Sequence, residues 1–201
     1  MYLIPQGTGW IEVITGCMFS GKTEELIRRL SLAQYARQKV VVFKPQLDNR
    51  YSETHVVSHG NRRIECHVVS DPLEIPALAG ENQVVGIDEA QFFDLNLVGI
   101  CETLADSGRR VVVAGLDLDY RGRPFEPIPQ LLARAEYITK NLAICMQCGN
   151  PADRSQRLVN RESRILIGAD DVYEARCRRC FVPESPGDIQ QVLPLRPVTF
   201  S

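Results

Sequence analysis

Gly16-Cys17-Met18-Phe19-Ser20-Gly21-Lys22-Thr23 is the stretch around which the chain is organised. It fits the pattern G-x-x-x-x-G-K-[ST], which forms a phosphate-binding loop between a strand and a helix. Residues 10–15 before it are rich in β-branched and aromatic side chains, as expected of a buried strand. Residues 24–30 after it carry apolar side chains at helical spacing. The order strand, glycine loop, helix predicts a nucleotide-binding site rather than a chance glycine turn.

The chemistry of phosphate binding explains the residue types in this loop. Gly16 and Gly21 let the backbone turn tightly and approach an anion closely. The N-terminus of the following helix presents unpaired N–H groups and a partial positive charge. Lys22 supplies a positive charge for the β- and γ-phosphates, and Thr23 offers a hydroxyl to Mg²⁺.

A pair of carboxylates follows another apolar run, at residues 84–87. A buried strand that ends in Asp88 and Glu89 has the pattern of a Walker-B element. We expect Asp88 to hold Mg²⁺, directly or through water. Glu89 would point to the other side of the strand end, free to abstract a proton. The alternative is an acidic pair that merely ends a strand.

The remaining pattern indicates the fold class. Further strands are expected at residues 40–43 and 110–115, and helices at residues 24–38 and 95–106. Alternating strands and helices predict an α/β fold, with a parallel sheet flanked by helices and ligands at its C-terminal edge. The phosphate loop and the acidic pair should meet at that edge. On the first helix we expect Arg28, Arg29 and Arg37 to lie on the solvated face.

Two loops carry candidate ligand-binding side chains. Arg50 could clamp phosphate oxygens by a bidentate contact, and an exposed loop arginine fits the sequence equally well. Tyr120 and Phe125 follow the strand at residues 110–115, where loop aromatics suggest stacking on a planar ligand. Core packing under the loop is the alternative for these two rings.

Four cysteines form two C-x-x-C pairs, Cys145 with Cys148 and Cys177 with Cys180. This pattern predicts a structural Zn²⁺ held by four thiolates, which leaves no open position for chemistry. A redox dithiol or chance spacing is the alternative. The 28 residues between the pairs exceed the usual spacing of about 15–20, so the metal would pin the base of a long loop.

Composition narrows the partners and suggests how the chain is divided. The 23 basic and 25 acidic residues give a net charge of −2, which provides no reason to expect nucleic acid or a membrane surface. We saw no signal peptide or membrane helix, and the seven cysteines suit a reducing cytoplasm. We expect a nucleotide-binding domain at 1–140, a zinc-binding domain at 141–183 and an extended or disordered tail at 184–201.

Together these motifs resemble the zinc-containing P-loop thymidine kinases of bacteria and of the animal cytosol. The matching stretches are GCMFSGKT, DNRYS with SHG, DEAQFF, AGLDLDYRGRPF, CMQC and CRRC. The resemblance implies transfer of the γ-phosphoryl of ATP to the 5′-hydroxyl of thymidine or deoxyuridine, in the salvage of DNA precursors. It also implies Mg²⁺, a structural Zn²⁺ and a homotetramer.

The resemblance further implies roles for individual residues, with Glu89 as the base that accepts the 5′-hydroxyl proton. The magnesium ligands would be Thr23 and Asp88. The nucleotide would be bound by Gly16 to Thr23, Arg50, Asp88, Glu89, Ala90 and Gln91, with Arg157 assisting. The pyrimidine pocket would comprise Met18, Phe92, Leu116, Tyr120, Phe125, Ser155 and Tyr173, closed by a lasso at Leu166, Ile167 and Gly168. Animal members carry proline at the position of Cys17 and phenylalanine at that of Tyr120.

Two other functions fit parts of the pattern. A P-loop NTPase of another kind would use Glu89 to activate water. A zinc-ribbon module that binds nucleic acid, with a regulatory nucleotide site, would use Arg178 and Arg179, although the acidic balance of the chain disfavours it.

Overall fold

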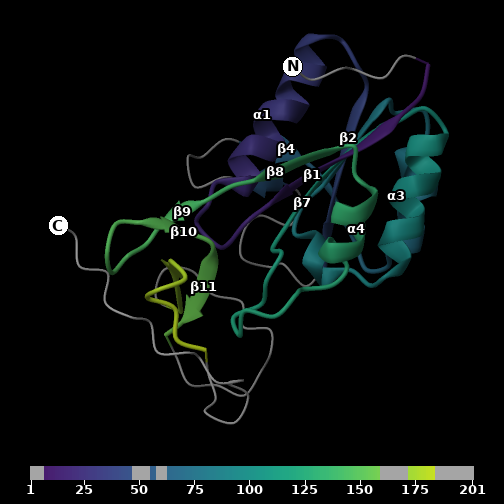
Figure 1. Cartoon of the computed structure of the whole chain (residues 1–201). Helices are drawn as coiled ribbons and strands as arrows, with labels where there is room; N and C mark the ends of the chain where they lie inside the picture. Colours follow the sequence, from purple (N-terminus) through teal and green to yellow (C-terminus); the bar gives the residue numbers. More distant parts are fainter. Residues whose placement is uncertain (1–6, 47–54, 58–62, 159–171, 184–201) are drawn as a thin grey trace.

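A computed structural model of the chain describes residues 7–46, 55–57, 63–158 and 172–183 (Figure 1). Its centre is a six-stranded sheet with the strand order β5-β2-β6-β7-β1-β8. Every neighbouring pair in this sheet is parallel, which confirms the predicted α/β class. The strands are β1 (Trp10–Thr15), β2 (Val40–Pro45), β5 (His67–Val69), β6 (Val84–Ile87), β7 (Arg110–Gly115) and β8 (Tyr137–Lys140).

Helices cover both faces of the sheet (Figure 1). Among the described residues they are α1 (Lys22–Tyr35), α2 (Ile75–Ala79), α3 (Asn96–Asp106) and α4 (Ile128–Arg134), with 3₁₀ turns η1 (Pro72–Glu74) and η2 (Ala90–Phe92). Side chains alternate along each strand, so β1 directs Ile11 and Val13 into one apolar cluster and Ile14 into the other. The first cluster contains α3 and α4, whereas the second contains α1.

None of the described helices is both long enough and apolar enough to cross a membrane.

The remaining strands of the described chain form short antiparallel pairs. They are β3 (His55–Val57) with β4 (Arg63–Glu65), β9 (Ala143–Ile144) with β10 (Pro151–Ala152), and β11 (Arg154–Arg157) with β12 (Tyr173–Arg176). A third cluster joins Cys17 of the phosphate loop to residues of this part, namely Ala143, Cys145, Ala152, Ala175 and Cys177. The division of the chain at residues 140 and 183 stays a prediction.

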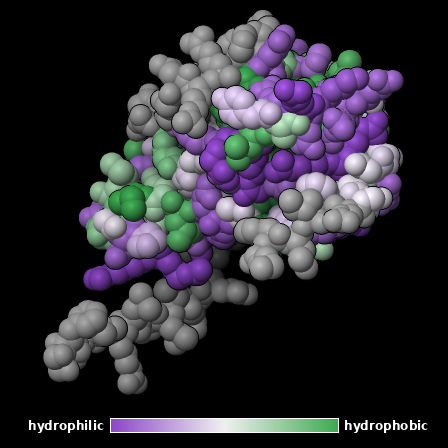
Figure 2. All heavy atoms as spheres, turned by 90° about the horizontal axis from the view of Figure 1, so that it is seen from above, coloured by the Kyte–Doolittle hydropathy of each residue, from purple (hydrophilic) through white to green (hydrophobic). Residues whose placement is uncertain are grey.

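Three large apolar side chains are exposed in and beside β9. Leu142, Ile144 and Met146 are 53%, 65% and 69% exposed. Figure 2 shows hydrophobic spheres gathered at the left of the view, the side on which Figure 1 places β9 and β10.

One expectation about α1 was wrong. Arg29 does not lie on the solvated face, because its side chain is only 13% exposed and pairs with both Glu12 and Glu25, at 2.8 and 2.7 Å. A glutamate in the middle of an apolar strand was the available signal, since a buried carboxylate needs a partner. The helix also begins two residues earlier and ends three residues earlier than predicted.

Candidate active site

The phosphate loop connects β1 to α1 and is held by its own polar groups. The Lys22 ammonium donates to the Cys17 carbonyl at 2.8 Å, and the Ser20 hydroxyl donates to the same oxygen at 2.7 Å. Gly16 and Gly21 have φ angles of 142° and 75°, in the region that favours glycine. At Gly16 a Cβ would also lie 2.3 Å from the Asn141 carbonyl oxygen. The loop therefore requires glycine at these positions.

The acidic pair meets this loop at the C-terminal edge of the sheet. Asp88 directly follows β6, and its Oδ2 accepts a hydrogen bond from the Thr23 hydroxyl at 3.3 Å. Its Oδ1 accepts from the Glu89 N–H at 3.0 Å. Strand β7 lies between β1 and β6, so the two motifs meet across an intervening strand. A hydroxyl and a carboxylate on one edge are oxygen donors of the kind that Mg²⁺ prefers, and that role stays a prediction.

Negative charge surrounds the Lys22 ammonium. Its enclosed position lowers the pKa of Lys22, while the carboxylates of Glu89, Asp88 and Asp117 oppose that shift. Bound phosphate would act in the same direction as the carboxylates, because a nearby anion favours the charged form of an amine. An anionic ligand beside Lys22 would therefore help to keep this enclosed amine in its charged form.

Glu89 stands in an unusual backbone conformation. Its φ and ψ angles are 50° and 40°, a left-handed conformation that costs a non-glycine residue roughly 1–2 kcal/mol. Its side-chain Oε2 accepts a hydrogen bond from Gln91 Nε2 at 2.5 Å, and the expected role of the carboxylate in proton abstraction stays a prediction. The carboxylate is thus held in place beside the phosphate loop.

Several expected pocket residues gather around this edge. The rings of Phe92 and Phe125 meet edge to face, with centroids 6.2 Å apart. The Leu116 N–H donates to Gln91 Oε1, and the Met18 N–H donates to the Ser155 hydroxyl, both at 3.0 Å. Met18, Phe92, Leu116 and Phe125 are partly exposed, so a ligand can reach them. Their role in binding a base stays a prediction.

Tyr120 and Tyr173, like Ser155, are buried, unlike the four partly exposed residues. The Arg157 guanidinium lies 3.5 Å from the centroid of the Tyr120 ring and donates to the Tyr173 hydroxyl at 3.0 Å. The Tyr120 hydroxyl accepts from Arg121 Nε at 2.8 Å. Tyr120 is thus packed under the loop in this structure, and its part in binding a planar ligand stays a prediction. Arg50, Leu166, Ile167, Gly168 and the tail from residue 184 lie outside the described residues.

The four cysteines of the two C-x-x-C pairs form one cluster. The sulfurs of Cys145, Cys148, Cys177 and Cys180 all lie within 4.8 Å of one another. Four thiolates at this spacing are the ligand set of a structural zinc site, which they fit. Burial raises the pKa of Cys145, but backbone N–H groups outweigh this effect and lower it to about 6. By contrast, burial raises the pKa of Cys101 to about 12, as expected of an inert core thiol.

Comparison with known proteins agrees with this assembly of motifs. The family model described as thymidine kinase matches residues 9–181. The chain belongs to the thymidine kinase family. The thymidine kinase of Rhodothermus sp. is 61% identical over 178 residues, which cover 89% of this chain and 84% of that protein. The thymidine kinase of Bdellovibrio bacteriovorus is 54% identical over 177 residues, covering 88% and 87%.

Among solved structures, the flagellar accessory protein FlaH from Methanocaldococcus jannaschii resembles this family member weakly. The TM-score is 0.47 and the sequence identity 10%, over 72% of this chain and 75% of that one. The likeness is too slight to bear on fold or function.

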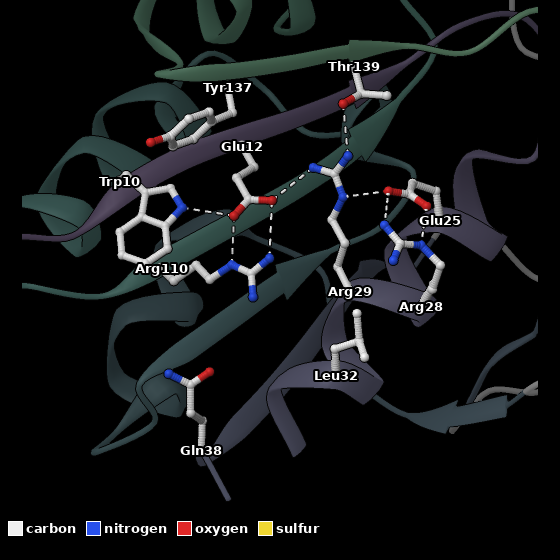
Figure 3. A pocket seen from close by; sticks show the side chains of 10 residues that line it. All are labelled: Trp10, Glu12, Glu25, Arg28, Arg29, Leu32, Gln38, Arg110, Tyr137 and Thr139. Carbon is white, nitrogen blue, oxygen red and sulfur yellow. Dashed lines mark hydrogen bonds and ion pairs between the residues drawn. The ribbon is translucent and has the colours of Figure 1, made fainter. Parts of the chain in front are cut away.

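A separate cavity of about 540 Å³ lies on the α1 side of β1 and β8 (Figure 3). Inside it, Glu12 accepts hydrogen bonds from Trp10, Arg29 and Arg110 at 2.6 to 2.8 Å. Burial raises the pKa of Glu12, and these hydrogen bonds more than reverse the shift. The lining residues are Trp10, Glu12, Glu25, Arg28, Arg29, Leu32, Gln38, Arg110, Tyr137 and Thr139. None of the predicted site residues lines this cavity, and its buried charges pair with one another.

Two contacts of the active edge were not foreseen from the sequence. They are the hydrogen bond between the Met18 N–H and Ser155 and the bridge that Gln91 makes from Glu89 to Leu116. The first joins residues 137 positions apart, and no pattern within either segment indicates it. The second had no signal in the sequence either, because a glutamine two residues after an acidic pair is as readily exposed as buried.

Proposed function

We propose that this thymidine kinase family member transfers the γ-phosphoryl of ATP to the 5′-hydroxyl of thymidine or deoxyuridine, giving the 5′-monophosphate and ADP. The family membership carries the proposal, because the family model spans residues 9–181 and a relative of this name shares 61% identity with the chain. The meeting of the phosphate loop with Asp88 and Glu89 supports it, since phosphoryl transfer depends mainly on positioning and charge stabilisation.

In the proposed mechanism each residue of the edge has one task. Backbone N–H groups at the start of α1 and the Lys22 ammonium hold the phosphates. Thr23 and Asp88 would hold Mg²⁺, which neutralises charge on the β- and γ-phosphates when bound. The Glu89 carboxylate accepts the proton of the 5′-hydroxyl as that oxygen attacks the γ-phosphorus. Arg50 would bind phosphate oxygens.

The nucleoside would lie against the partly exposed side chains beside Glu89. Phe92 and Phe125 offer aromatic surface for a pyrimidine ring, and Met18 and Leu116 complete the apolar wall. Leu166, Ile167 and Gly168 would close over the base, as the resemblance implies. The four-cysteine cluster would hold Zn²⁺ in a structural role at the base of that loop.

A nucleoside panel tests the proposal. The protein is incubated with ATP and Mg²⁺ plus thymidine, deoxyuridine, deoxycytidine or a purine deoxynucleoside, and monophosphate and ADP are measured separately. We expect ADP to form only with thymidine or deoxyuridine, in equal amount to the monophosphate. ADP formed at the same rate without nucleoside would instead indicate an NTPase that activates water.

We also propose that the kinase acts in the cytoplasm as a homotetramer, as the resemblance implies. Light scattering coupled to size-exclusion chromatography should give about four times the 22.6 kDa mass of one chain. A mass of one or two chains over the micromolar range would contradict this assembly.

A further inference from the structure

We propose that Gln91 is a positioning residue that fixes the Glu89 carboxylate relative to the wall of the nucleoside pocket. This inference rests on the proposed function, in which Glu89 accepts the 5′-hydroxyl proton. Gln91 is already expected to help bind the nucleotide. The inference assigns its side-chain amide a second task.

The orientation of the Gln91 amide follows from its two partners. A backbone N–H can only donate, so the atom that faces the Leu116 N–H at 3.0 Å is the amide oxygen. The amide nitrogen must then face Glu89, where it donates to Oε2 at 2.5 Å. Flipping the amide would place two donors against each other at Leu116. The Gln91 side chain therefore always presents N–H groups, and never an acceptor, to the Glu89 carboxylate.

The surroundings hold this bridge in one position. Gln91 is 3% exposed, so bulk water cannot readily replace either contact. It belongs to the short 3₁₀ turn η2, which begins directly after Glu89. On the other side lies Gly115, where an added Cβ would come within 3.0 Å of Gln91 Oε1 and 2.6 Å of Ile128 Cδ1. The end of β7 thus leaves room for the amide because it lacks a side chain there.

The Gln91 amide connects the general base, Glu89, to Leu116 in the wall of the nucleoside pocket. Leu116 is an expected pocket residue, and its backbone position is tied through the amide to the Glu89 carboxylate. A glutamate side chain has three rotatable bonds, and holding it in one rotamer keeps its oxygen at the distance that proton transfer requires. A donor partner also leaves the carboxylate ionised and ready to accept a proton.

Two substitutions separate the halves of the bridge. Gln91→Met keeps the length of the side chain and removes both hydrogen bonds. Gln91→Glu can still accept from the Leu116 N–H, but it loses the donor and brings a like charge to Glu89. We expect both to lower kcat about 10- to 100-fold, the effect of losing a hydrogen bond to a charged group. The affinity for ATP should stay near that of the wild type in both variants. The melting temperature of Gln91→Glu should fall, because the variant buries a second carboxylate beside Glu89, so kcat is measured at a temperature where both variants are folded.

A matched control is Gln130→Met, the same change on α4 outside the site, which should leave kcat unaltered. The coupling is tested in a Glu89→Asp background, whose shorter side chain places the carboxylate elsewhere. In that background Gln91→Met should lower kcat at most a few-fold, because Gln91 acts through the position of the Glu89 carboxylate. The wild-type enzyme is assayed for thymidine phosphorylation in parallel, so that failure of the proposed function is seen separately.

Three results would overturn the inference in an active enzyme. The first is a kcat within twofold of wild type for both Gln91 variants. The second is a loss that appears only as a higher KM for ATP. The third is an equal fold-decrease in kcat on Gln91→Met with and without Glu89→Asp, which would assign Gln91 a merely structural role.

Discussion

Single side chains at the sheet edge determine which chemistry is available. Thr23 and Asp88 touch through one hydrogen bond of 3.3 Å, although they belong to segments 65 positions apart. The two motifs that contain them were predicted to face each other from sequence alone, because each has a fixed place at the end of a parallel strand. Gln91 could not be assigned its bridge in this way, since its partner Leu116 follows a different strand.

Replacing Glu89 by glutamine should stop phosphoryl transfer and leave ATP binding intact. The amide cannot accept the 5′-hydroxyl proton, and loss of a general base costs about 10²- to 10⁴-fold in rate. Monophosphate formation measures the rate, and titration calorimetry measures ATP binding. Glu81→Gln, a change at a side chain that is 90% exposed, should behave as wild type. Near-normal turnover of Glu89→Gln would refute the assignment of the base.

Replacing Thr23 by valine should raise the Mg²⁺ concentration needed for half-maximal activity. Valine has nearly the shape of threonine but lacks the hydroxyl that would bind the metal. We expect an increase of about tenfold or more, as seen when support of a metal site is lost. Activity is titrated against Mg²⁺ at saturating ATP and thymidine, with the exposed Thr103→Val as the control. An unchanged Mg²⁺ requirement would exclude Thr23 as a ligand.

Whole elements followed from the sequence where the hydrophobic pattern was long and regular. The runs at residues 10–15 and 110–115 became β1 and β7 with the predicted bounds. The start of α1 was missed because the helix begins at Lys22, inside the loop motif, and no side chain caps it. Strands β9 to β12 have two to four residues each, too few to show a period of two.

The ion pairs of α1 make the stability of the chain pH-dependent. Hydrogen bonds from Arg28 and Arg29, opposed by partial burial, lower the pKa of Glu25 to about 2, against an ordinary value of 4.5. A carboxyl whose pKa is depressed by folding stabilises the protein above pH 4.5, and this contribution disappears as the pH falls toward 2.

The Glu25→Gln variant should therefore be less stable than wild type at pH 7, by about 1 kcal/mol after allowance for solvent screening. The difference should be constant from pH 8 to about pH 6 and shrink below pH 4.5. Urea unfolding across this range gives the two free energies of unfolding at each pH. A difference that grows as the pH falls would contradict the role of the Arg28 and Arg29 pairs.

At the scale of the whole molecule, the four-cysteine cluster is joined to the phosphate loop. Cys17 packs in the same apolar cluster as Cys145 and Cys177, and its thiol donates to the Ala152 carbonyl at 3.4 Å. The second link is the hydrogen bond from the Met18 N–H to Ser155 of β11. Loosening the cysteine cluster should therefore disturb the phosphate loop as well as the nucleoside side of the site.

Cys145→Ser should release zinc, lower the melting temperature and weaken ATP binding. A serine hydroxyl is a poor replacement for a thiolate, so the tetrahedral ligand set would be incomplete. Zinc is measured by elemental analysis of the purified protein, and ATP affinity by calorimetry. Cys101→Ala changes a buried thiol that belongs to the α3 core and should retain the metal. A full zinc content in Cys145→Ser would argue against the four-thiolate site.

The double attachment of the loop at Cys17 and Met18 also bears on how freely relatives can exchange parts. In a hybrid whose residues 141–183 come from a homologue, the Cys17 side chain would pack against residues of the homologue instead of its own partners. If the homologue has a bulkier or stiffer residue at position 17, its segment 141–183 is shaped for that residue and should pack poorly against Cys17. Exchanging position 17 together with residues 141–183 should restore the packing. Functional hybrids between relatives are therefore expected to take both parts from the same parent.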